Sequence, residues 1–126
     1  METGVLAAAE GRSIWVIGDR YTIKCDGNDT SGAFALIEAV VPPGNGPPPH
    51  IHGREDEAFY VLEGLYTFYT DSDPAEGIGP GTFVFIPPGA VHGFRTGPDG
   101  GRLLCLWPST VEAAFFGGST DTAADD

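Results

Sequence analysis

The stretch GNGPPPHIHGREDEAFYVLEG, residues 44–64, decides how the rest of this chain is interpreted. It contains His50 and His52 as an H-x-H pair, and its run of acidic residues ends at Glu57. Alternate side chains of an extended strand lie on one face, so the two imidazoles emerge together, ~6.6 Å apart at ~3.3 Å per residue. Two imidazoles at this spacing can bind one metal ion, whose bonds to nitrogen are about 2.0–2.1 Å long.

The third histidine of the chain, His92, lies downstream in GTFVFIPPGAVHGF, residues 81–94. A further histidine and a carboxylate would complete a mixed nitrogen–oxygen shell that suits a first-row divalent metal. The proline-rich residues 42–49 precede the H-x-H pair. Each proline fixes φ and removes a donor, so this stiff connection should aim His50 and His52 with little conformational freedom.

The composition predicts one all-β domain. A chain of 126 residues with 41% apolar and 19% charged residues is globular and fits a single core. Its 19 glycines and 11 prolines separate aromatic and β-branched runs, which indicates many short strands joined by tight turns. We expect a flexible N-terminus over residues 1–10, the domain over 11–116 and a disordered acidic tail over 117–126. A short helical turn is expected at 110–116.

Two strand patterns matter for the site. In the strand expected at 34–41, Ala35, Ile37, Ala39 and Val41 form an apolar face, and Glu38 lies on the opposite face. The strands expected at 57–62 and 65–70 flank Glu63-Gly64, which predicts a hairpin with glycine at the φ > 0 position. One hairpin face carries Glu57, Phe59, Val61, Tyr66, Phe68 and Thr70.

The opposite hairpin face is also apolar, with Tyr60, Leu62, Leu65 and Tyr69. Strands with two apolar faces are usually covered on both sides. Soluble monomers seldom expose large apolar patches, so this stripe predicts a homodimer.

Charge and cysteine content limit the partners and the compartment. The net charge of −12 and only six Lys and Arg residues argue against nucleic acid as a partner. Cys25 and Cys105 show neither a secreted disulfide framework nor C-x-x-C spacing. No signal peptide and no run of ~18 apolar residues is evident, so no membrane partner is expected and a cytoplasmic location is the default.

The two histidine-containing stretches resemble the paired motifs of the cupin superfamily, in particular its small single-domain members. The first motif is glycine, five residues, H-x-H, four residues, glutamate, six residues, glycine, and residues 44–64 match every spacing. The second is matched by Gly81, Pro87, Gly89 and His92, with Thr96 in place of the terminal asparagine. The amino-acid sequence of these two stretches is similar to that of bacterial cupins described as quercetin-dioxygenase-like. A lone H-x-H is a weak signal, but here all three histidines fall at ligand positions.

The resemblance implies a cupin jelly-roll barrel, or double-stranded β-helix. It also implies one divalent transition metal per chain (Fe, Mn, Ni, Co, Cu or Zn), held by His50, His52, Glu57 and His92. Glu57 would serve both as ligand and as general base, and Glu38 is the alternative base. The function expected is that of a metal-dependent enzyme acting on a small aromatic or enolisable molecule, foremost a dioxygenase. A non-redox cyclase or isomerase of polyketide-like substrates is the alternative, and a non-catalytic ligand-binding cupin is the third.

Overall fold

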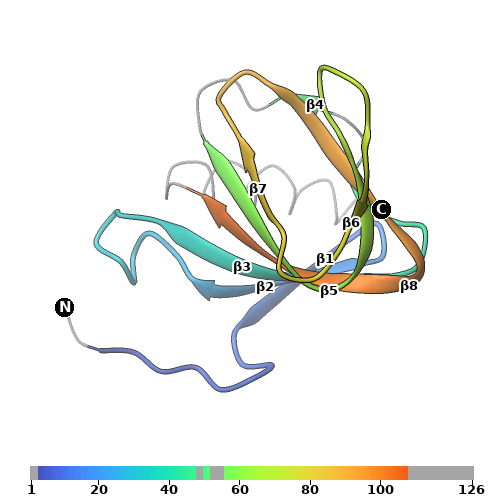
Figure 1. Cartoon of the computed structure of the whole chain (residues 1–126). Coiled ribbons are helices and arrows are strands. Elements are labelled where there is room, and N and C mark those ends of the chain that lie inside the picture. The colour runs from blue at the N-terminus through green and yellow to red at the C-terminus, as the bar shows by residue number, and fades with distance from the viewer. Residues whose placement is uncertain (1–2, 48–49, 52–55, 108–126) are drawn as a thin grey trace.

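Eight β-strands make up the fold in a computed structural model that describes residues 3–47, 50–51 and 56–107 (Figure 1). In chain order they are β1 (Arg12–Val16), β2 (Asp19–Cys25), β3 (Ala35–Val41), β4 (His50–Ile51), β5 (Glu57–Tyr69), β6 (Ala75–Ile78), β7 (Phe83–Ile86) and β8 (Val91–Trp107). None of the described residues belongs to a helix with the length and hydropathy that crossing a membrane requires. The helical turn predicted at 110–116 and the tail at 117–126 lie outside the described residues.

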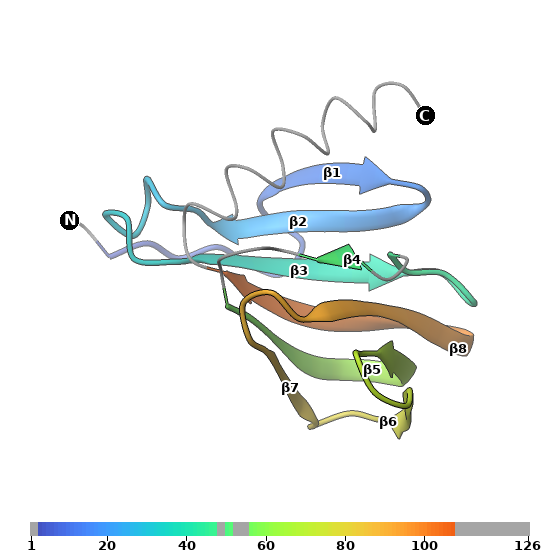
Figure 2. The same ribbon diagram turned by 90° about the horizontal axis from the view of Figure 1, so that it is seen from above.

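All strand pairs are antiparallel, in the order β1-β2-β3-β8-β5-β6, with β4 added to β8 and β7 added to β5. The last part of β8 pairs with β3, whereas its first residues pair with β4. Figure 1 shows β8 bending along its length to reach both neighbours, and Figure 2 shows the stack of strands from above. The sheet therefore curls over its own inner face, and the predicted all-β jelly-roll barrel is confirmed.

The hairpin predicted at Glu63-Gly64 is wrong, because β5 runs without a turn from Glu57 to Tyr69. Its register against β8 shifts between Val61 and Glu63 and again between Gly64 and Tyr66. Gly64 does have a positive φ, of 90°, and a Cβ there would collide with the carbonyl oxygen of Gly100. Register shifts of this kind bend a strand and raise its twist. The glycine is used for a bend and a close backbone approach rather than for a turn.

The interior of the barrel is filled by the faces that the sequence pattern assigned to it. Ala35, Ile37, Ala39 and Val41 of β3 are at most 2% exposed, and Glu38 lies on the outer face. The register shifts in β5 leave the same set of side chains facing the interior before and after the bend. The face predicted from the sequence is therefore confirmed for five buried residues: Glu57, Phe59, Val61, Tyr66 and Phe68. The rings of Phe59, Tyr66, Phe68 and Phe94 pack with centroids between 5.4 and 6.0 Å apart. Such pairs contribute ~0.5–1.5 kcal/mol each beyond their buried area.

The outer face of β5 is apolar and, within this chain's described residues, exposed. Tyr60 is 46% exposed, and its neighbour across the strand pair, Phe83, is 62% exposed. Phe85 and Leu106 flank Ala58 on either side and are also exposed. The homodimer, which would cover this face, stays a prediction.

Candidate metal centre

Glu57 and His92 reach the same place in the barrel from the first residues of two long strands. Glu57 begins β5, and His92 is the second residue of β8, directly after the turn that Pro87 closes by accepting the N–H of Ala90. Both side chains are buried, with 3% exposure each. Nε2 of His92 lies 2.9 Å from Oε1 of Glu57. The structure therefore joins one residue from each of the two sequence motifs.

The backbone of His50 and Ile51, the first two residues of the H-x-H segment, lies against the same part of β8. In β4 the backbone of His50 is directly opposite that of His92, and Ile51 is opposite Val91. Opposed residues of an antiparallel pair have Cα atoms about 4.5–5.5 Å apart. The third predicted histidine, His52, lies outside the described residues. The four-residue ligand set therefore remains a prediction, of which two side chains are seen in contact.

Thr96 holds the proline-rich stretch that leads to His50. Its N–H donates to the carbonyl oxygen of Asn45 at 2.9 Å, and its hydroxyl accepts the N–H of Asn45 at 3.1 Å. Phe94 N–H also donates to the carbonyl oxygen of Pro47. Thr96, which stands in place of the motif asparagine, therefore contacts this loop from within β8.

The donor atoms of the buried pair suit a shared cation. Nδ1 of His92 lies 3.3 Å from the carbonyl oxygen of Ala90. A histidine that donates from Nδ1 presents the lone pair of Nε2, which is how metal-binding histidines are commonly oriented. Here that nitrogen faces a carboxylate oxygen, so either a proton or a metal ion must lie between the two atoms. A metal with bonds of about 2.0–2.2 Å to nitrogen and oxygen can reach both donors at once.

The electrostatics of the pair favour a positive charge. Burial lowers the pKa of His92, but the hydrogen bond and charge of Glu57, together with the carbonyl of Ala90, outweigh burial and raise that pKa above its ordinary value. In the absence of metal the pair therefore retains a proton on His92 to a higher pH than an isolated histidine would. A bound metal ion would replace that proton, because the ligand nitrogen must be deprotonated.

The pair borders two spaces. A cavity of about 20 Å³ lies beside it, lined by Tyr21, Pro47, Glu57, Phe59, His92, Phe94, Cys105 and Trp107. A larger hollow of about 390 Å³ also has Glu57 and Trp107 in its lining, and Phe34, Phe83, Phe85 and Leu106 contribute to that lining. The size and apolar lining of the hollow are typical of small-molecule sites. Glu57 stands between the inner cavity and the hollow.

The cavity includes residues that sequence reasoning did not assign to a site. Burial raises the pKa of the Tyr21 hydroxyl and of the Cys105 thiol well above their ordinary values, and nearby carboxylates add to both shifts. Both groups are therefore neutral at neutral pH, and the thiol is not a nucleophile. Alternation in β2 and β8 marks these residues as inward-facing, but nothing in the sequence indicates that they meet Glu57.

Glu38, the alternative base, does not lie at this site. It accepts a hydrogen bond from Nη1 of Arg102 at 2.7 Å on the outer face of the sheet. Within the described residues, no group of three or more His, Cys, Asp or Glu side chains gathers closely enough to hold a metal ion.

Comparisons with known proteins agree with this architecture. The chain matches the Cupin domain family over residues 37–107. It is 31% identical over 112 residues to quercetin 2,3-dioxygenase of Bacillus subtilis, a match that covers 88% of this chain and 33% of that protein. It is 32% identical over 100 residues to dimethylsulfoniopropionate lyase DddQ of Ruegeria pomeroyi, covering 76% of this chain and 49% of that protein. The chain thus spans between a third and a half of the length of these curated relatives.

Solved structures show the same fold. The polyketide cyclase RemF from Streptomyces resistomycificus superposes with a TM-score of 0.75 at 28% identity, over 86% of this chain and 80% of that chain. An RmlC-like cupin from Shewanella frigidimarina superposes with a TM-score of 0.72 over 86% of this chain and 92% of that chain, and at 18% identity it supports the fold alone. The matched family domain, the curled antiparallel sheet and these relatives establish that the chain belongs to the cupin family.

Proposed function

We propose that this protein is a metal-dependent enzyme that acts on a small aromatic or enolisable molecule, and that it is a dioxygenase. The observation that carries this proposal is the buried contact between His92 and Glu57 beside an apolar hollow. Buried charged groups are stable only when paired or bound to a metal. A site with such a pair at the wall of a hollow is a candidate for catalysis.

The metal would be held by His50, His52, Glu57 and His92, and Fe, Mn, Ni, Co, Cu and Zn all accept these ligands. When bound, a divalent ion supplies a Lewis acid for an enolate or phenolate oxygen and, if it is redox-active, reactivity toward dioxygen. Coordination geometry and metal supply, rather than ligand type, select among these ions.

The chain's own contribution centres on Glu57. Its carboxylate borders the hollow and is in contact with His92, so it can accept a proton from a hydroxyl or an activated C–H of a substrate lying there. His92 Nδ1, near the carbonyl of Ala90, fixes the ring orientation. Glu57 is only 3% exposed, and the low dielectric of its buried surroundings strengthens its electrostatic interactions.

The lining of the hollow favours an aromatic substrate. Phe34, Phe83 and Phe85 contribute aromatic surface, and Trp107 extends from the inner cavity to the hollow. Aromatic rings pack favourably against one another in offset or edge-to-face arrangements. The resemblance to quercetin 2,3-dioxygenase, whose name specifies dioxygen chemistry on a named substrate, supports the dioxygenase assignment.

A non-redox cyclase or isomerase of polyketide-like substrates is the second candidate. This candidate is favoured because the chain matches a larger share of the cyclase than of the dioxygenase. The match to the polyketide cyclase RemF extends over 80% of that chain, whereas the match to quercetin 2,3-dioxygenase extends over 33% of that protein. In that reaction the metal would act as a Lewis acid alone, with Glu57 in the same role as base.

The test has two parts. First, the metal content of protein purified without added metal is measured, and we expect iron, nickel or manganese rather than zinc alone. Second, flavonols and aromatic 1,3-diketones are assayed with and without dioxygen, and we expect dioxygen consumption with turnover and binding without product under anaerobic conditions. Equal rates in both conditions would replace the dioxygenase with the cyclase or isomerase. Binding without turnover in either condition, across both substrate classes and with metal bound, would favour a non-catalytic cupin.

A further inference from the structure

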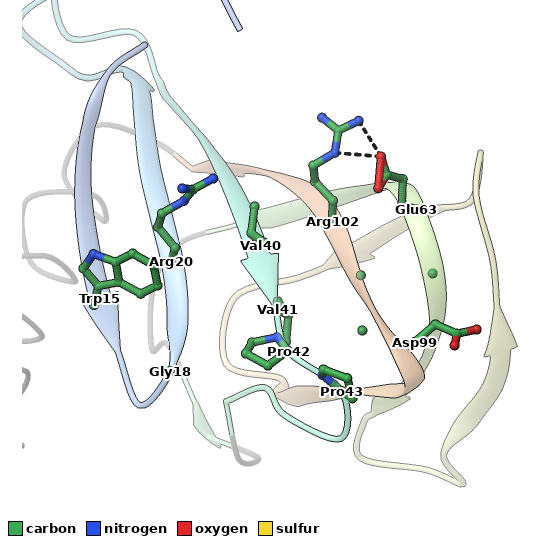
Figure 3. A pocket seen from close by; sticks show the side chains of 13 residues that line it. Trp15, Gly18, Arg20, Val40, Val41, Pro42, Pro43, Glu63, Asp99 and Arg102 are labelled. Atoms are coloured by element: carbon green, nitrogen blue, oxygen red, sulfur yellow. Dashed lines mark hydrogen bonds and ion pairs between the residues drawn. The ribbon is translucent and has the colours of Figure 1, made fainter. Parts of the chain in front are cut away.

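A second hollow lies on the outer face of the sheet, and none of its lining residues borders the cavity beside Glu57 and His92 (Figure 3). It has a volume of about 680 Å³, and we call it the outer groove. Trp15, Arg20, Val40, Arg102 and Glu63 form one row across it, because each residue pairs with the next on β1, β2, β3, β8 and β5. Directly opposed residues share a face of the sheet. The row therefore places two arginines on either side of Val40.

The two arginines differ in their partners. Arg102 donates from Nη1 to Glu38 at 2.7 Å and from Nε and Nη2 to Glu63 at 3.2 and 3.0 Å. These contacts raise the pKa of Arg102 and satisfy its charge with two carboxylates. Arg102 is therefore already paired within the protein and is not free to bind another anion.

Arg20 has no such partner among the described residues. Its Nε is buried and makes no hydrogen bond there, and no carboxylate forms an ion pair with its guanidinium. Its contact is with the ring of Trp15, whose centroid is 5.8 Å from the guanidinium carbon. A buried donor without an acceptor is destabilising, the more so when the group is charged. Among the described residues, Arg20 therefore combines a guanidinium that has no carboxylate partner with an aromatic ring beside it.

The residues around Arg20 provide an apolar surface and limit the negative charge that a bound ligand can carry. Val40 and Pro42 form apolar parts of the lining, and Trp15, at 61% exposed, offers an aromatic ring at one wall (Figure 3). Asp99 and Glu63 lie at the opposite side of the groove. A ligand with one carboxylate can pair with Arg20, whereas a second negative charge would meet these acids.

We propose that the outer groove binds a small organic monocarboxylate with an aromatic or apolar body. The carboxylate accepts two hydrogen bonds from the guanidinium of Arg20, one from each Nη atom, in an end-on bidentate geometry, because Nε is buried. The body of the ligand packs against Trp15, Val40 and Pro42. This site is separate from the proposed metal centre, so its existence does not depend on the proposed function.

The test uses full-length, ¹⁵N-labelled protein and phenylacetate as the probe, followed by amide chemical shifts at low ionic strength. We expect saturable shifts in β1, β2 and β3 around Trp15, Arg20 and Val40, with a dissociation constant on the order of 1 mM for a ligand of this size. Phenylacetamide, which has the same shape without the charge, should bind on the order of tenfold more weakly or worse. Arg20→Gln should weaken phenylacetate binding by a similar factor.

Two variants control the experiment. Arg95→Gln removes the same charge from an exposed position of β8 outside the groove and should leave phenylacetate affinity unchanged. Trp15→Ala removes an exposed ring and should weaken binding without loss of the native spectrum. The proposal is overturned if no saturable shifts occur, if phenylacetamide binds as tightly as phenylacetate, or if Arg20→Gln retains wild-type affinity. It is also overturned if binding is lost in His92→Ala and kept in Arg20→Gln, because the carboxylate would then bind at the metal centre.

Discussion

Nε2 of His92 lies 2.9 Å from Oε1 of Glu57, although the two residues stand at opposite ends of the longest strand pair in the molecule. In the β5–β8 register, Ala58 is opposite Leu106 and Tyr69 is opposite Gly93. Twelve residues of extended strand separate these ends, roughly 40 Å at ~3.3 Å per residue. The contact exists because the pair bends at the two register shifts around Gly64 and closes over its inner face.

The first prediction is that each chain binds one divalent metal ion and that His92→Ala or His50→Ala removes it. Loss of one ligand from a buried site lowers affinity strongly, and metal per chain is measured by elemental analysis after gel filtration. Phe94→Leu, which alters the lining of the same cavity without touching a ligand, is the control and should keep the metal. A histidine variant with full occupancy would remove that residue from the ligand set. Metal affinity should fall as the pH drops, and the fall should begin above the ordinary histidine pKa, because Glu57 raises the pKa of His92 and protons compete for the ligands.

The second prediction separates ligation from catalysis at Glu57. Glu57→Gln keeps the shape and an oxygen ligand but removes the negative charge and the basicity, so we expect weakened but measurable metal binding. General-base catalysis contributes ~10²–10⁴-fold, and the rate per bound metal should fall by about that factor. Substrate affinity should change much less.

Glu38→Gln is the matched control for that experiment, because Glu38 is ion-paired to Arg102 on the outer face. It should leave the rate unchanged. If Glu57→Gln matches the wild-type rate per metal, Glu57 is a ligand alone. A slow Glu38→Gln variant with normal metal content would instead restore Glu38 as the base.

The third prediction is a homodimer formed through the exposed apolar face of β5. Tyr60 and Leu65, which belong to the stripe predicted from the sequence, are 46% and 58% exposed, and burying them against a second copy would remove apolar surface from water. Light scattering should give a dimer mass at micromolar concentration, and Leu65→Lys should shift the protein to monomer. Trp15→Ala, an exposed aromatic on β1, should remain dimeric. A monomer mass for the wild type contradicts the prediction.

The fourth prediction concerns the bend in β5. Gly64→Ala places a Cβ at a φ of 90° and against the carbonyl oxygen of Gly100, so the free energy of unfolding should fall by more than the ~1–2 kcal/mol of left-handed backbone strain. Urea denaturation measures the loss. Gly97→Ala is the control, because a Cβ there would lie 3.6 Å from its nearest neighbour, an ordinary contact. Equal stability of the two variants would show that the bend does not require glycine.

The fifth prediction uses the buried carboxyl of Asp19. Burial raises its pKa, and hydrogen bonds from Asn45 and Tyr21 offset part of that rise. Since the folded-state pKa exceeds the unfolded value, the stability that this group contributes is fully present below about pH 3.9 and is lost as pH rises through the folded-state pKa. The wild type should therefore lose stability relative to Asp19→Asn over that interval.

Denaturant unfolding across a pH series gives the comparison for Asp19. Asp73→Asn, at an exposed loop position, should follow the pH dependence of the wild type. If the difference between wild type and Asp19→Asn is flat from acid to neutral pH, the predicted linkage is absent.

Several features were predictable because they depend on local pattern. Alternation in residues 35–41 identified the buried face of β3 and the outward position of Glu38, since strand side chains alternate with a period of two. Two spaced motifs identified the family, and the family implied the fold. Glycine at position 64 correctly indicated a positive φ.

Other features were decided by tertiary structure. A two-residue Glu-Gly pattern is compatible with a turn or with a bend in a continuous strand, and only pairing with β8 decided between them. The pairing of β3 with β8 decided that Arg102 is the partner of the outward-facing Glu38. Arg20 and Trp15 became a candidate site only when pairing across five strands placed Arg102 and its acids beside them. Side-chain alternation is a property of one strand, whereas the partners a side chain meets depend on strand order and curvature, which residues distant in the chain determine together.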